Sequence, residues 1–231
     1  MIIGSGFIAN SFMHLYQNDA SICIFASGTS NSLNTDTDDF KREYDLIEKI
    51  LKDNIVNSKL VYFSSCSVLN QNVSEITPYT QHKINMEKLV STHPKHLIIR
   101  LPSVAGRSVN PNTLLNFIYS KIKSHESFDL WVNAYRNIID IDDVVELSEK
   151  IIGSDTFLNT TINIANPNNY KMVEIVNEME KVLGKPSIHK KVDKGSEYKI
   201  DIEPIQAFMT SSQKDYEKHY LSSTLFKYYQ N

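Results

Sequence analysis

The stretch MIIGSGFIA, residues 1–9, guides the interpretation of the whole chain. A short apolar run, Met1 to Ile3, meets glycine at once and is followed by an apolar-periodic stretch, which predicts a strand, a turn and a helix. Residues 4–9 match the pattern G-x-G-x-x-A, where backbone N–H groups and a helix N-terminus can hold a pyrophosphate. A tight turn without any ligand would use the same small residues. The stretch favours nucleotide binding and needs support from the rest of the chain.

The composition is typical of a globular protein with an ordinary core. The chain has 231 residues, of which 41% are apolar and 22% charged, enough for one domain or a domain with a subdomain. The formal net charge is −3 with no basic block, which gives no footprint for nucleic acid. Apolar runs are strand-length, and the only cysteines, Cys23 and Cys66, follow no secretory leader. We expect a cytoplasmic protein with no nucleic-acid or membrane partner.

Short apolar runs alternate with amphipathic stretches through the first two thirds of the chain. Strands are expected at 1–3, 22–25, 60–63, 97–101 and 161–164, with shorter ones near 128, 138 and 187–192. Helices are expected from residue 7, at 36–54, 78–89, 111–123, 142–152 and 171–183, and from about 221. Continuous apolar strands between helices predict an α/β fold with a doubly wound parallel sheet covered on both faces.

Tyr79 and Lys83 form a Y-x-x-x-K pair at the start of the helix expected at 78–89. That spacing puts a phenol and an ammonium on one helix face, where the positive charge favours the ionised phenol and suits it to proton transfer. The same spacing occurs at Tyr119 and Lys123, so the spacing alone decides nothing. Tyr79 differs in its context, because the strand before it ends in the serine-rich segment 64–67.

Seven segments, in order, resemble the extended short-chain dehydrogenase/reductases, or NAD-dependent epimerase/dehydratases, which act mostly on nucleotide sugars. They are GSGFIA (4–9), IFASG (24–28), VYFSSCSV (61–68), PYTQHK (78–83), IIRLPSVAG (98–106), YRNIIDIDDVV (135–145) and INIANPNNYKMVEIV (162–176). The likeness runs nearly end to end, and the order of the segments makes it specific. It implies a nicotinamide cofactor and a homodimer formed through the helices at 36–54 and 78–89.

The chain departs from this family in the adenine-binding half. The family's second strand ends in an acidic residue for the adenine ribose, roughly 20 residues after the glycine turn. Here the run 22–25 ends in Ala26-Ser27-Gly28, and only one long helix fits between 29 and 59. We therefore expect a Rossmann-like sheet that lacks the usual second and third strands, at 1–101 and 138–165. The rest, 102–137 and 166–231, would be a small α+β substrate-binding subdomain. Adenine would be exposed, or held by the loop 27–32 or a partner subunit.

The resemblance assigns catalytic roles to three residues. Tyr79 would be the general acid/base, Lys83 would hold the nicotinamide ribose and tune Tyr79, and Ser65 would hydrogen-bond the substrate oxygen. Ser64 and Ser67 remain alternatives to Ser65, and plain turn capping is a third possibility. The implied cofactor contacts are Gly4, Ser5, Gly6, Phe7, Ile8, Ala26, Ser27, Gly28, Tyr79 and Lys83, and the cofactor is NADP or NAD, with NADPH slightly favoured.

On the substrate side, the resemblance implies contacts from Ser65, Cys66, Asn112, Leu114 and Arg136. The segment containing Asn112 and Leu114 would touch the base or phosphates, and Arg136 would grip the diphosphate bidentately. Asn112 could instead be a helix N-cap.

Two basic residues on the substrate side could have other roles. Arg136 could instead form a surface ion pair with Asp140 or Asp142. Lys194 lies where the family often carries a further phosphate-binding arginine, and it could equally be solvated charge.

The residues that follow the proposed catalytic serine limit which reactions of the family this chain could catalyse. Dehydratases of the family usually have Asp-Glu after the catalytic hydroxyl, whereas this chain has Cys66-Ser67, which disfavours dehydration. A cysteine there resembles the GDP-fucose synthases, but the loop 102–110 has no histidine to work with it, so we interpret Cys66 as a buried small hydrophobe. No Cys/His cluster has metal-ligand spacing. We expect reduction of a 4-keto-6-deoxy sugar nucleotide in surface polysaccharide precursor synthesis. The alternatives are a sugar-nucleotide 4-epimerase and a non-catalytic sugar-nucleotide-binding module.

Overall fold

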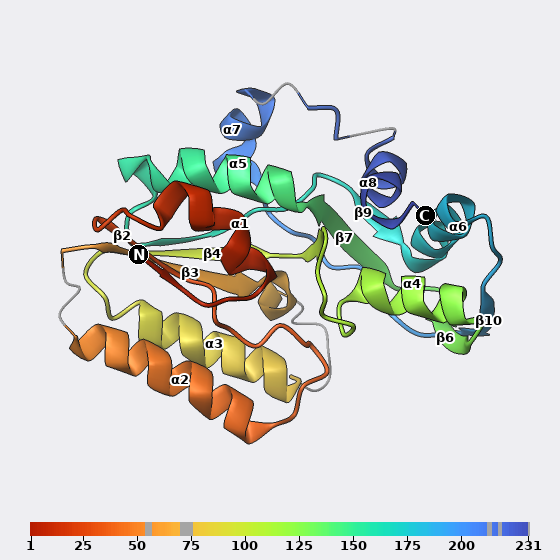
Figure 1. Ribbon diagram of the computed structural model, residues 1–231, viewed down its shortest axis with the longest axis horizontal. Helices are drawn as coiled ribbons and strands as arrows, with labels where there is room; N and C mark the ends of the chain where they lie inside the picture. Colours follow the sequence, from red (N-terminus) through yellow and green to blue (C-terminus); the bar gives the residue numbers. More distant parts are fainter. Residues whose placement is uncertain (54–56, 70–75, 212–213, 217–218, 231) are drawn as a thin grey trace.

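The computed structural model describes residues 1–53, 57–69, 76–211, 214–216 and 219–230. Its centre is a parallel five-stranded sheet in the order β1-β2-β3-β4-β8. These strands are β1 (Ile2–Ile3), β2 (Ile22–Phe25), β3 (Lys59–Ser65), β4 (His96–Leu101) and β8 (Thr160–Asn163). Helices α1 (Phe7–Tyr16) and α5 (Ile141–Ile152) cover one face, and α2 (Thr37–Lys52) and α3 (Pro78–Val90) cover the other (Figure 1). The predicted α/β fold with a covered parallel sheet is confirmed.

Both faces of the sheet are buried, which explains why its strands are continuous apolar runs. Ile24, Val61 and Leu97 belong to the core beneath α1 and α5, while Phe25 and Ile98 belong to the core beneath α2 and α3. All five are fully buried. Each such side chain contributes roughly 1.5–3 kcal/mol relative to an exposed position, so the strands need no alternating pattern.

The short strand β1 lies at the edge of the sheet. Among the described residues, no strand lies beyond β1, and the chain passes from α1 directly to β2, which pairs with the inner side of β1. The prediction that the usual second and third strands are missing is therefore confirmed. The consequence is an open edge where the adenine-binding half of such a sheet normally lies.

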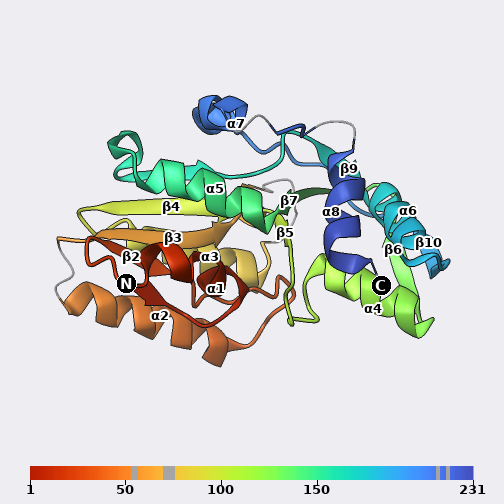
Figure 2. The same ribbon diagram turned by 45° about the horizontal axis from the view of Figure 1, so that its top comes forward.

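A second lobe begins directly after β4 (Figure 2). It contains a sheet ordered β5-β7-β9 and the parallel pair β6 and β10. Its strands are β5 (Ser103–Ala105), β6 (Ser127–Trp131), β7 (Tyr135–Asp140), β9 (Asn169–Lys171) and β10 (Ile188–Val192), and its helices are α4 (Leu114–Ser124), α6 (Met172–Leu183) and α8 (Tyr220–Tyr229). All of these elements except β10 contribute to one apolar cluster, which includes Leu115, Ile138 and Val176.

Short helical elements complete the described chain: η1 (Cys66–Leu69), η2 (Asp155–Phe157), η3 (Glu203–Ile205) and α7 (Gln206–Ser211). Ile205 and Met209 pack into the core beneath α5, so part of the C-terminal segment returns to the first lobe. The boundaries of the substrate-binding part stay a prediction. Among the described residues, no helix has both the length and the apolarity required to cross a membrane.

Helix α4 begins at Leu114, three residues later than the expected start at residue 111. The cause is local, because Asn110 accepts a hydrogen bond from the Asn112 N–H at 2.9 Å, which forms a turn before the helix. The helix begins after Thr113, so the alternative that Asn112 is the N-cap is wrong.

Candidate active site

The glycine turn after β1 has the geometry that a phosphate-binding turn requires. Gly4 has φ +129°, and a Cβ there would lie 2.5 Å from the Ala26 carbonyl oxygen, so only glycine fits. Gly6 precedes α1, and a Cβ at this position would meet nothing within 4 Å. Helix α1 has no side-chain cap and no acidic residue in its first turn. The open N-terminus of α1 therefore suits an anion.

The other residues of this turn contribute differently. Ser5 is exposed, whereas Phe7 and Ile8 pack their side chains against the core, so only their backbone N–H groups could serve a ligand. Phe7 is tightly held, since a Cβ on Gly106 would come within 2.3 Å of its ring. This turn therefore offers backbone N–H groups and an uncapped helix start to a phosphate group.

Three serines follow one another at the carboxyl end of β3, and the structure separates them. The Ser64 hydroxyl is buried and donates to Glu87 Oε1 at 2.6 Å, so it is committed to an internal bond. The Ser67 hydroxyl is buried and has no partner among the described residues. Ser65 is half-buried, and its Oγ accepts the Ser67 N–H at 3.2 Å, while among the described residues its own proton has no acceptor. This geometry supports Ser65, the residue chosen from the sequence.

The Tyr79–Lys83 pair lies on α3, which packs against β3 and η1. Thr77 caps this helix by accepting the Thr80 N–H, and Pro78 occupies its first turn. The Lys83 Nζ lies 5.8 Å from the centroid of the Tyr79 ring. The Tyr79 hydroxyl has no hydrogen-bond partner among the described residues, which leaves it free for a substrate oxygen.

Lys83 is itself held by a buried carboxylate that sequence reasoning missed. Glu43 of α2 is fully buried, and its Oε1 accepts hydrogen bonds from Lys83 Nζ at 2.9 Å and from the Tyr62 hydroxyl at 2.7 Å. Burial alone would raise the pKa of Glu43, but the charge of Lys83 and the hydrogen bonds from His82, Lys83 and Tyr62 outweigh it and lower the pKa. The carboxylate is therefore ionised. A glutamate on the apolar face of helix α2 was the available signal.

Cys66 is fully buried at the start of η1, and burial raises the pKa of its thiol to about 12. A neutral, buried thiol confirms the interpretation of Cys66 as a small hydrophobe. Tyr198 lies in the same neighbourhood and also escaped the sequence analysis. Burial raises the pKa of Tyr198 to about 12, and Cys66, Arg136 and Tyr79 exert smaller electrostatic effects on it. Its hydroxyl has no hydrogen-bond partner among the described residues.

Arg136 of β7 is half-buried and has no acidic partner among the described residues. Its Nη1 donates to the Tyr135 carbonyl at 2.7 Å, and burial lowers the pKa of its guanidinium. The alternative ion pair with Asp140 or Asp142 is wrong, because both carboxylates accept from Lys227 at 2.7 Å. A partly desolvated guanidinium with no counter-charge in the described part of the chain is suited to an anionic group.

In the described part of the chain, the remaining residues predicted on the substrate side form no hydrogen bond or ion pair with Ser65, Tyr79 or Lys83. Asn112 is exposed, and Leu114 is half-buried at the first turn of α4. Lys194 is exposed, with its Nζ 5.9 Å from the Trp131 ring centroid. Tyr119 and Lys123 bond each other at 2.7 Å on the exposed side of α4. Their separate location agrees with the choice of the Tyr79 pair.

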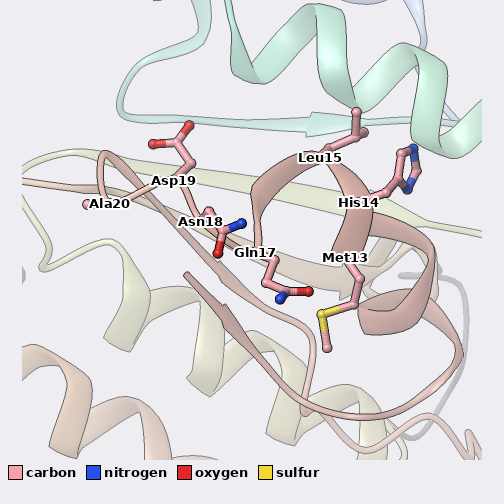
Figure 3. Close-up of a pocket in the computed structure, with 7 residues that line it drawn as sticks. All are labelled: Met13, His14, Leu15, Gln17, Asn18, Asp19 and Ala20. Carbon is pink, nitrogen blue, oxygen red and sulfur yellow. The ribbon is translucent and has the colours of Figure 1, made fainter.

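A surface hollow lies at the C-terminal end of α1 (Figure 3). Its lining residues are Met13, His14, Leu15, Gln17, Asn18, Asp19 and Ala20. It lies at the opposite end of α1 from the glycine turn, so it is separate from the candidate site.

Comparison with solved structures identifies the fold. UDP-glucuronic acid 4-epimerase from Bacillus cereus, in complex with UDP-glucuronic acid and NAD, superposes with a TM-score of 0.74 at 16% identity, covering 96% of this chain and 78% of that one. RMD from Pseudomonas aeruginosa, in complex with NADPH, superposes with a TM-score of 0.69 at 12% identity, covering 89% of this chain and 91% of that one. dTDP-glucose 4,6-dehydratase from Bacillus anthracis, in complex with NAD, superposes with a TM-score of 0.68 at 16% identity, covering 96% of this chain and 78% of that one.

The chain therefore has the fold of the NAD-dependent epimerase/dehydratase enzymes, in a version shortened at β1. No family model matches the sequence, and no curated protein does.

Proposed function

We propose that this chain is an NAD(P)-dependent reductase that acts on a nucleotide-linked keto sugar of the 4-keto-6-deoxy class. One observation carries the proposal: Lys83 lies over the ring of Tyr79 on a helix packed against β3, which ends at Ser65, and among the described residues the hydroxyl protons of Tyr79 and Ser65 have no acceptor. Turns that contain glycine follow the neighbouring strands β1 and β2, and a Cβ on Gly6 in the first of them would meet nothing within 4 Å. A structural neighbour that binds a nucleotide sugar together with NAD supports the substrate class.

A bound reduced nicotinamide would supply a hydride to the carbonyl carbon of the sugar. The chain's own residues would do the rest. Ser65 would donate a hydrogen bond to the carbonyl oxygen, and Tyr79 would transfer its phenolic proton to that oxygen as the carbonyl becomes an alcohol. The ammonium of Lys83 would stabilise the resulting phenolate until a proton from water restores it. Proton transfer from a positioned group contributes typically 10²–10⁴-fold to the rate.

Two observations favour reduction over dehydration. A dehydratase needs groups that remove and return protons across the C5–C6 bond, and Cys66 is too deeply buried and too weakly acidic for that role. The buried carboxylates that bond site residues in the described part of the chain are also occupied, because Glu43 pairs with Lys83 and Glu87 pairs with Arg100. Reduction requires only a hydroxyl, a phenol, an ammonium and a hydride donor.

Arg136 supplies the anchor for the substrate in this proposal. Its guanidinium can form two parallel hydrogen bonds with phosphate oxygens, and no acidic residue competes for it in the described part of the chain. Tyr198 is close enough to Arg136 and Tyr79 to interact with them electrostatically, and in this proposal it would contact the sugar. The homodimer through α2 and α3, the polysaccharide pathway and the preference for NADPH stay predictions.

The test begins with calorimetric titration of cofactor-stripped protein with NADPH and NADH. Loss of nicotinamide absorbance is then followed with 4-keto-6-deoxy sugar nucleotides. Tyr79→Phe should bind cofactor as the wild type does and lose turnover by about 10²–10⁴-fold. The matched control is Tyr119→Phe, which removes the phenol of the same spacing on α4 and should leave both properties unchanged. An active Tyr79→Phe protein would refute the proposal.

A further inference from the structure

Glu43 lies beneath the proposed site and has no role in the chemistry described so far. Its carboxylate accepts four hydrogen bonds. Lys83 and Tyr62 donate to Oε1, while His82 Nε2 at 2.9 Å and the Thr29 N–H at 2.7 Å bond Oε2. These donors come from β3, α3 and the loop after β2. One carboxylate therefore ties together the segment that carries Lys83 and the loop implied in cofactor binding.

Stability alone is a weak reason for this arrangement. Taking two charges out of water offsets much of their attraction, so a buried ion pair is often no more stable than apolar residues of the same size. Here both partners are buried, with Glu43 at 0% and Lys83 at 2% exposure. What the pair does fix is the position of an otherwise flexible lysine side chain.

The donors of Lys83 are almost fully assigned. An ammonium has three N–H donors. Lys83 uses one for Glu43 Oε1 and another for the Tyr62 hydroxyl at 3.2 Å, and Tyr62 itself donates to the same Oε1. This closed triangle leaves, among the described residues, one N–H of Lys83 for a ligand.

The position of Gly28 indicates where the remaining N–H of Lys83 lies. A Cβ on Gly28 would lie 2.8 Å from both Glu43 Oε1 and Lys83 Nζ, so the loop backbone rests directly against the pair. The contact is possible only because Gly28 has no side chain. The ammonium therefore lies where a ligand on this loop would meet it.

We infer that Glu43 is a positioning residue that fixes the Lys83 ammonium against the Gly28 backbone, so that its free N–H meets a hydroxyl of the bound cofactor's ribose. This inference rests on the proposed function, because it requires a nicotinamide cofactor on the Gly28 loop. Glu43 acts through Lys83 and touches neither cofactor nor substrate.

The decisive measurement is cofactor affinity, followed by nicotinamide fluorescence without substrate. Glu43→Gln keeps the side-chain size, removes the charge and presents an N–H₂ group to neighbouring donors. We expect its Kd for NADPH or NADH to rise by about 10- to 100-fold, as for other groups that orient a ligand-binding side chain. Glu48→Gln is the matched control, because Glu48 lies on the same helix in an exposed pair with Lys52 and should not change the Kd.

A double-mutant cycle separates positioning from a general loss of structure. In a Lys83→Met background, Glu43→Gln should cause no further loss of affinity, since the residue that it positions is gone. Glu43→Asp, which keeps the charge on a shorter side chain, should recover part of the affinity. If Glu43→Gln does not fold, Gly28→Ala serves instead, because its Cβ displaces the pair and should weaken cofactor binding without removing either charge.

Each outcome has one meaning. A wild-type protein without affinity for either cofactor overturns the proposed function, and this inference with it. A wild type that binds, beside a Glu43→Gln variant with the same Kd, overturns this inference and leaves the function standing. Effects of Glu43→Gln and Lys83→Met that simply add would also overturn it.

Discussion

Replacing Arg136 by methionine tests the substrate-binding half of the site. Arg136 is half-buried, and its guanidinium donates a hydrogen bond to the carbonyl of its neighbour Tyr135. A hydrogen bond from a charged donor contributes about 1.5–3 kcal/mol. Losing the grip on a diphosphate should therefore weaken binding of a nucleoside diphosphate by about 10- to 150-fold, since each 1.4 kcal/mol is tenfold. Arg136→Lys keeps the positive charge but not the planar guanidinium, so its affinity for the nucleoside diphosphate should lie between those of the wild type and Arg136→Met.

The fold itself should tolerate this change. Arg136 has no acidic partner in the described part of the chain, so methionine breaks no ion pair and removes a desolvated charge. We expect the free energy of unfolding to stay within about 0.5 kcal/mol of the wild type or to rise. Calorimetric titration with nucleoside diphosphates and urea unfolding measure the two quantities, with exposed Arg107→Met as the control. Wild-type affinity in Arg136→Met would refute the assignment.

Three further predictions concern the turn, the thiols and acid stability. Gly4→Ala should lose about 1–3 kcal/mol of stability and also its cofactor affinity, because the new Cβ would collide with the backbone at Ala26. Gly6→Ala should keep its stability and lose only its cofactor affinity. Urea unfolding measures the stability of each variant, and calorimetric titration measures its affinity. Burial raises the pKa of Cys23 to about 11 and that of Cys66 to about 12, so a thiol reagent should label neither until denaturant unfolds the protein, and fast labelling at neutral pH would contradict their burial. The pKa of Glu43 is lowered in the folded state, so its stabilisation is present above the unfolded value of about 4.3 and is lost as the pH falls below it. The urea midpoint should therefore fall more steeply on acidification in the wild type than in Glu43→Gln.

The sequence by itself determined the elements of the first lobe and their order. Ile22–Phe25 is a strand with the expected bounds, and Pro78 begins a helix as expected. Local rules suffice here, because apolar periodicity and capping act within a few residues. The missing strands were also readable, since chain length between two fixed points limits what can fit. The short strands Ser103–Ala105 and Asn169–Lys171 escaped notice, because three residues carry no period and are held only by their partner strand.

Only the tertiary structure decided which groups are free and which are occupied. The resemblance favoured Ser65 but left Ser64 open, and only the fold shows that Ser64 bonds Glu87, 23 residues away, while Ser65 does not. Glu43 and Lys83 are 40 positions apart, and no local pattern predicts that they bond. Arg136 has nearby acids in the sequence, but Lys227 takes them in the fold. The physical reason is the same in each case: a side chain's charge state and partners are set by burial and by contacts between distant segments.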